Sequence, residues 1–259
     1  IRALLAVAPE RTAYRERLVL LEAQIRERQF GAAISRGMEA VGKRDLQGAR
    51  DRLAAARRLS PGRPEVALLG GQVQKLAESV RLDELMGHAA QAAGRDDWVA
   101  ALGSYSEALK IDAGNRAAIE GAQMAQAIVD LMARIEAHLQ NAHRLSSPAA
   151  AADARAVLAL GAARAGQSPT LADGLARLSS LIEAYGRKVP LRVRSDSQTE
   201  IVVRGVGKVG RTTEKVIELK PGAYTFEGMR PGYKARLVDV SIAPGQTDIV
   251  VEVVCDEPL

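Results

Sequence analysis

The sequence has one cysteine, few aromatic residues and no long apolar run. Because Cys255 is the single cysteine among 259 residues, no disulfide forms within the chain, which fits a reducing compartment or an envelope protein without disulfides. Aromatic residues make up 3% of the sequence, which argues against an aromatic-lined ligand pocket. No stretch of about 18 apolar residues is present, so we expect no membrane-spanning helix between Ile1 and Leu259.

Basic residues are only slightly in excess. The formal net charge is +5, with 25 Lys and Arg against 21 Asp and Glu in residues 1–187, and 11 against 10 in residues 188–259. The densest basic run consists of Arg50, Arg52, Arg57 and Arg58. It shares a predicted helix with Asp45 and Asp51, which is typical of a solvated helix face. Phosphate binding requires basic residues clustered on one surface, so we expect no nucleic-acid partner.

Residues 1–187 have helical periodicity almost throughout. Apolar residues recur at spacings of three to five, as at Leu18, Leu21 and Ile25. Proline and glycine at the breaks predict four helices, at about 45–59, 64–93, 97–111 and 116–142. Ser147-Pro148 and Ser168-Pro169 predict two more, over 149–164 and 169–185.

The segment GRDDWVAALGSYSEALKIDAGN (94–115) repeats the pattern of GKRDLQGARDRLAAARRLSPGR (42–63). In the later copy large and small residues alternate at Trp98, Ala101, Tyr105 and Ala108. This order resembles the second helix of the tetratricopeptide repeat, although the first helices lack that family's signature and the copies stand about 52 residues apart rather than 34. The resemblance implies a stacked helical array that offers an extended surface to protein partners.

From residue 188 the pattern changes to short apolar runs with period two. The predicted strands are PLRVR, TEIVVR, EKVIEL, AYTFEG, ARLVDVSI and TDIVVEVV. Their spacing predicts a small antiparallel β-sandwich or barrel over 188–259, following a helical domain over 1–187. Gly-Arg-Thr-Thr (210–213), Leu-x-Pro-Gly-x-Tyr (219–224), Pro-Gly-Tyr (231–233) and Pro-Gly (244–245) occur in an order that resembles the PEGA domain, although the stretch that names the family is missing.

The sequence GVGKVG (205–210) fits the dinucleotide-binding pattern of spaced glycines but precedes a predicted strand instead of a helix. A kinase phosphate loop does lie between two strands, but the other sequence signatures of kinases are missing. We therefore interpret these glycines as a hairpin. His138 and His143 are five residues apart and lack a third ligand, so we interpret them as ordinary histidines on a helix surface. Ser104 and Ser106 have no adjacent base. We therefore expect no catalytic, cofactor-binding or metal-binding residues.

Several side chains fit two interpretations. Trp98 and Tyr105 fit core packing better than partner binding, while Asp96 and Asp97 fit the N-terminus of a helix. Tyr224, Phe226 and Tyr233 are the aromatic residues that a carbohydrate-binding face of the β-region would require. The residues that bind a partner are not assigned by the periodicity.

These observations predict a non-catalytic scaffold that binds proteins through its helical array. The two resemblances imply a bacterial envelope protein at the periplasmic face of the inner membrane, anchored by one upstream helix. The start at Ile1 suggests a segment of a longer protein. Two alternatives stay open: a module that binds cell-wall polymer, and an accessory region of an enzyme whose catalytic domain lies outside residues 1–259.

Overall fold

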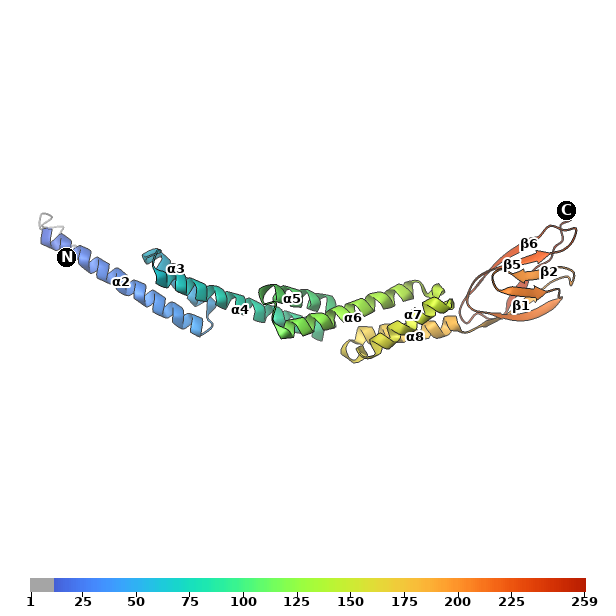
Figure 1. The fold of residues 1–259 in the computed structure, drawn as a ribbon, viewed down its shortest axis with the longest axis horizontal. Coiled ribbons are helices and arrows are strands. Elements are labelled where there is room, and N and C mark those ends of the chain that lie inside the picture. Colours follow the sequence, from blue (N-terminus) through green and yellow to red (C-terminus); the bar gives the residue numbers. More distant parts are fainter. Residues whose placement is uncertain (1–11) are drawn as a thin grey trace. The chain divides into compact units, whose positions relative to one another are not determined.

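A computed structural model describes residues 12–259, in which helices are followed by strands (Figure 1). The α-helices in this range are α2 (Thr12–Gly42), α3 (Leu46–Leu59), α4 (Pro64–Gly94), α5 (Trp98–Ile111), α6 (Arg116–Gln140), α7 (Pro148–Ala162) and α8 (Pro169–Gly186). Two short 3-10 helices, η1 (Ala142–Ser146) and η2 (Ala165–Gln167), precede α7 and α8. The predicted helices are confirmed with small shifts at their ends, while the helical prediction for residues 1–11 lies outside the described residues. Of the helices between Thr12 and Gly186, none combines the length and apolarity needed to cross a bilayer.

Capping side chains explain where several helices begin. Asp45 accepts a hydrogen bond from the backbone amide of Gly48 at 2.9 Å, at the start of α3. Ser147 and Ser168 do the same before α7 and α8, and a proline follows each serine at the first helical position. Such caps satisfy amides that have no partner inside the helix.

Two compact units divide the described residues. The first comprises residues 12–94 and 100–122. The buried core between α2, α3 and α4 consists of Phe30, Ala33, Ala49, Leu53, Ala56, Val66, Leu69 and Val73. A β-carbon at Gly37 would lie 2.6 Å from Cδ2 of Leu69, so a larger residue here would require the Leu69 side chain to shift.

The second compact unit comprises residues 95–99 and 123–259 and holds the last helices and all the strands. Helix α8 contacts both α7 and η1, and it buries Leu171, Leu175, Leu178 and Ile182. The change from helix to strand falls between Gly186 and Val189. The division of the chain into separate domains at residues 187 and 188 stays a prediction.

The strands form a three-stranded and a four-stranded sheet, with the orders β4-β1-β7 and β3-β2-β5-β6. Their bounds are β1 (Val189–Arg194), β2 (Glu200–Val203), β3 (Gly207–Gly210), β4 (Glu214–Leu219), β5 (Gly222–Met229), β6 (Arg236–Ile242) and β7 (Ile249–Glu252). All six predicted strands are present. The prediction was incomplete in two respects: β3 lies inside the glycine-rich hairpin, and β7 pairs with β1 in parallel, whereas the other pairs are antiparallel.

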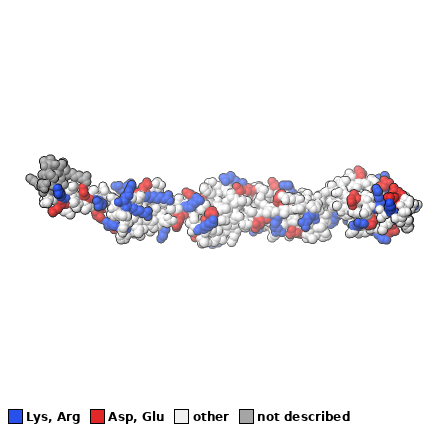
Figure 2. Space-filling view, turned by 90° about the horizontal axis from the view of Figure 1, so that it is seen from above, with Lys and Arg blue, Asp and Glu red and all other residues white. Residues whose placement is uncertain are grey.

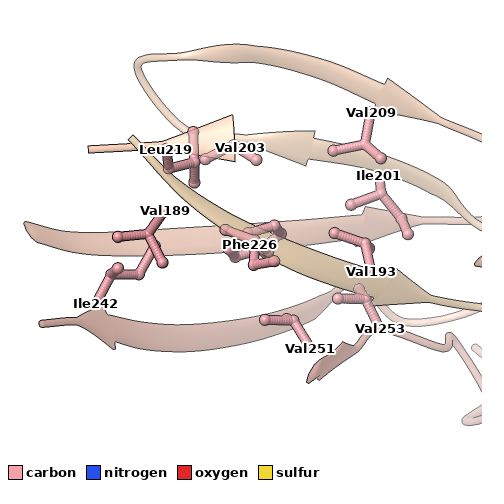
Figure 3. Close-up of a cluster of buried hydrophobic side chains, with 11 residues drawn as sticks. Val189, Val193, Ile201, Val203, Val209, Leu219, Phe226, Ile242, Val251 and Val253 are labelled. Carbon is pink, nitrogen blue, oxygen red and sulfur yellow. The ribbon is translucent and has the colours of Figure 1, made fainter. Parts of the chain in front are cut away.

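Both sheets contribute to one cluster of buried side chains (Figure 3). Alternate residues of β1 are buried, as expected for a strand with one face toward the core. Phe226 of β5 is fully buried and lies among Val189, Val193 and Val203 in this cluster. The remaining buried members are Leu191, Ile201, Val209, Leu219, Ile242, Val251 and Val253.

Candidate protein-binding surface

Trp98 and Tyr105 belong to the interior of the helical region. The Trp98 side chain is 9% exposed, which confirms the prediction of core packing. Tyr105 is partly buried against the cluster that contains Leu85 and Ala108. A β-carbon on Gly121 would lie 2.4 Å from Cζ of Tyr105, so the ring occupies the space that this glycine leaves open.

Asp96 joins two distant parts of the second unit. Its backbone has a φ of 62°, and one carboxylate oxygen accepts a hydrogen bond from the Trp98 indole nitrogen at 2.6 Å. The other accepts from the backbone amide of Thr170, at the start of α8, at 2.8 Å. Burial raises the pKa of Asp96, but hydrogen bonds from Thr170, Ser168 and Trp98 outweigh it and lower the pKa to about 2. The predicted position of Asp96 directly before a helix is confirmed, since α5 begins at Trp98, but the helix amide that its carboxylate binds belongs to α8.

His138 is more enclosed than the helix-surface position predicted for it. Its side chain is 17% exposed, and Nε2 lies 3.0 Å from Oδ2 of Asp153 in α7. Arg134 approaches the other oxygen of Asp153 at 3.4 Å. His143 lies in η1 and is exposed, so the two histidines do not converge. No group of three His, Cys, Asp or Glu side chains within residues 12–259 has the geometry of a metal site.

The glycine-rich segment GVGKVG forms the predicted hairpin between β2 and β3. Gly205, Gly207 and Gly210 have φ values of 72°, 154° and 89°, a region that favours glycine. The amide of Val206 donates to the carbonyl of Val203 across the turn. No helix follows these glycines, so the geometry lacks the helix N-terminus that a dinucleotide phosphate requires.

The three aromatic residues considered for carbohydrate binding do not form one exposed face. Phe226 lies in the core, and Tyr224 packs against that core with its hydroxyl donating to the Lys220 carbonyl. Tyr233 is partly exposed, and its ring lies under the Arg230 guanidinium at 4.1 Å from the centroid. Arg230 also pairs with Asp196 at 3.0 Å.

An open groove of about 340 Å³ runs between α2 and α3. Its lining includes the side chains of Arg36, Arg52 and Arg58, and we call the part lined by alanines its floor. The other residues that line it are Gln29, Ala32, Ala33, Ala55 and Leu59. Hereafter we call this surface the α2–α3 groove.

The arginines of the α2–α3 groove lack carboxylate partners. Among the described residues, none forms a hydrogen bond or ion pair with Arg36, Arg52 or Arg58, and no Asp or Glu lines the groove. Arg36 interacts electrostatically with Glu39, whose carboxylate is paired with Lys43 at 2.6 Å. The groove therefore presents guanidinium groups that form no salt bridge within residues 12–259.

Net charge is concentrated in the same helices. Residues 12–59 contain 11 Lys and Arg against 6 Asp and Glu, a net charge of +5 that equals the net charge of the whole chain. Figure 2 shows the blue side chains gathered over the part of the chain that holds α3. The sequence thus shows an excess of basic residues over 12–59 that is averaged out over 1–187, while the helix faces that carry it are set by packing. The run from Arg50 to Arg58 is thus divided between the groove and other faces of α3.

Comparison with known proteins adds no family assignment: no family model matches the chain, and a search of curated proteins finds no relative.

Proposed function

We propose that this chain is a non-catalytic protein-binding scaffold whose helical part binds a partner through the α2–α3 groove. The observation that carries this proposal is the groove itself, which is lined by alanines and by three arginines that form no salt bridge within residues 12–259. Solvent-exposed grooves between two helices are a recurring site for a third helix from another protein. The β-region would then serve as an attached module.

The proposal includes a tetratricopeptide-like array over 1–187. Its support is the agreement between two copies: α2 and α4 each have 31 residues, and α3 and α5 each have 14. Arg44 and Asp96 occupy matching positions before α3 and α5 and share a positive φ. The small residues Ala49, Ala56, Ala101 and Ala108 are all fully buried at matching positions. These agreements favour two copies of one helical unit.

For residues 188–259 we propose a PEGA-like β-sandwich. Support comes from the order of the turns and from the common core that side chains of both sheets share. By that resemblance we also propose attachment at the periplasmic face of a bacterial inner membrane. The dispersed positions of Tyr224, Phe226 and Tyr233 favour a protein partner over cell-wall polymer.

Site-specific photocrosslinking in cells that express the intact protein tests the scaffold function. A photoreactive amino acid at Ala55, which lines the groove, is compared with the same amino acid at Ala54, which is exposed and does not line the groove. We expect a discrete protein adduct from position 55 and none from position 54. Equal adducts from both positions, or none from either, would refute the groove as a binding surface.

A further inference from the structure

We propose that the α2–α3 groove binds an acidic α-helical segment of its partner, whose carboxylates pair with Arg36, Arg52 and Arg58. This inference rests on the proposed function, because it names the chemistry of the partner at the same surface. It follows from three properties of the groove: its floor, its charge and the spacing of its arginines.

The floor of the groove favours close approach of a helix. Ala32 and Ala33 of α2 and Ala55 of α3 line it, beside Leu59. Small residues at such a contact allow helix axes to come within about 8 Å. The floor is apolar, so the partner gains most by placing small apolar side chains there.

The rim of the groove favours carboxylates over neutral groups. A guanidinium presents a planar set of donors that matches a carboxylate in two parallel hydrogen bonds. Because no carboxylate within residues 12–259 forms a salt bridge with Arg36, Arg52 or Arg58, binding breaks no salt bridge among these residues. Positive charge along α2 and α3 also accelerates the encounter with an acidic segment.

Spacing of the arginines indicates a sequence pattern for the ligand. Arg52 and Arg58 are six residues apart in α3, a rise of about 9 Å along the helix axis. Two glutamates seven residues apart on a ligand helix are separated by about 10.5 Å and lie on one face of that helix. The residues three and four positions after the first glutamate lie on the same face. The groove thus fits the pattern Glu-x-x-Ala-Ala-x-x-Glu, whose alanines meet the floor.

Other polyanions match this surface less well. No aromatic side chain lines the groove for base stacking, and the alanines that line it offer no side-chain donor to sugar or phosphate. A concave groove between helices also offers less contact area to a flat anionic membrane than the exposed basic face of a helix would.

The test uses purified chain and a fluorescent helical peptide of about 18 residues that carries this pattern. A matched peptide replaces each glutamate by glutamine. Fluorescence anisotropy should show saturable binding of the glutamate peptide, weaker by about tenfold or more for the glutamine peptide, with affinity that falls as salt is raised.

Two charge reversals separate groove binding from general attraction. Arg52→Glu changes the groove, whereas Arg50→Glu makes the same change of charge on another face of α3, where Arg50 is exposed. We expect Arg52→Glu to weaken binding about tenfold and Arg50→Glu less than about twofold. In addition, a peptide with lysine in place of glutamate should bind the Arg36→Glu/Arg52→Glu/Arg58→Glu variant better than it binds the unmodified chain.

Three results would overturn the inference. The first is equal loss of binding in the Arg50→Glu and Arg52→Glu variants, and the second is equal binding of the glutamate and glutamine peptides. The third is tighter binding of an oligonucleotide or of anionic phospholipid vesicles than of the glutamate peptide. Crosslinking at Ala55 keeps the two proposals distinguishable. If an adduct forms there while the acidic peptide fails to bind, the scaffold function stands and the acidic chemistry of its partner is wrong.

Discussion

Oδ2 of Asp96 accepts a hydrogen bond at 2.8 Å from the backbone amide of Thr170, which lies 74 residues further along the chain. The other carboxylate oxygen of Asp96 holds the indole of Trp98. A single side chain thus fixes the turn before α5 to the first turn of α8 and satisfies an amide that has no partner inside that helix.

Replacing Asp96 should loosen this connection. Asp96→Ala removes a charged acceptor from two donors, and we expect it to lower the free energy of unfolding by about 2 kcal/mol. Asp256→Ala is the control, because Asp256 is exposed and should leave stability within about 0.5 kcal/mol. Urea unfolding followed by the fluorescence of Trp98, the single tryptophan, measures both variants. Equal stability of the two variants would contradict the role assigned to Asp96.

Acid should destabilise the chain through Asp96 and Asp196. Hydrogen bonds from the Thr199 and Gln198 amides and the charge of Arg230 outweigh burial and lower the pKa of Asp196 to about 2, as the contacts described above do for Asp96. A depressed pKa means that each carboxylate stabilises the folded state above the unfolded value of about 3.9, and that this stability is lost as the pH falls toward 2.

Carboxyl titration by NMR and urea unfolding between pH 5 and pH 2 check this prediction. Both carboxyl groups should titrate near pH 2. The loss of stability on acidification should be smaller in Asp196→Asn than in the unmodified chain, because the amide does not titrate. A midpoint near pH 4 for either residue would show that its hydrogen bonds do not persist in solution.

Two glycines of α2 should respond in opposite directions to alanine. A β-carbon at Gly31 meets nothing within 4 Å, so Gly31→Ala should stabilise the helix by about 0.5–1 kcal/mol. At Gly37 the same change places a methyl group 2.6 Å from Leu69, and we expect a net loss of about 1–2 kcal/mol. Thermal unfolding by circular dichroism compares the pair, and stabilisation by both substitutions would contradict the close contact between α2 and α4.

Cys255 should be unreactive in the folded chain. Its side chain is 1% exposed, and its backbone amide donates to Oγ1 of Thr199 at 3.2 Å. We expect a thiol reagent to label it much more slowly in buffer than in denaturant. Gly228→Ala should accelerate labelling, because a β-carbon there lies 2.8 Å from Val253 and 3.4 Å from the cysteine sulfur. Rapid labelling of the unmodified chain would show that this end of the core opens readily.

The helices were predictable because local signals specify them. Ser147-Pro148 and Ser168-Pro169 combine a cap with a preferred first residue, and both mark a helix start in the structure. The alternation of apolar and basic residues in β1 is a local signal of the same kind, and its alternate residues are buried in the structure. The parallel pairing of β1 with β7 and the contact of Asp96 with Thr170 have no such signal, since each depends on how distant segments meet.

The α2–α3 groove was missed for a similar reason. Sequence places Arg52 and Arg58 on one helix with Asp45 and Asp51, which suggests local compensation of charge. In the structure Asp45 caps its own helix and Asp51 accepts a hydrogen bond from Gln47. Both carboxylates therefore accept hydrogen bonds from residues of α3, whereas Arg52 and Arg58 line the groove beside α2. This distribution depends on tertiary packing.

The position of β1 between β4 and β7 has a consequence for biosynthesis. Because β7 comes last of the strands and pairs with the first, β1 keeps one unpaired edge while the intervening residues emerge from the ribosome. The helices carry mostly local contacts and can form earlier in translation. A nascent chain stalled before Ile249 reaches the tunnel exit would expose that edge to neighbouring chains, so the β-region matures only after translation of its final strand.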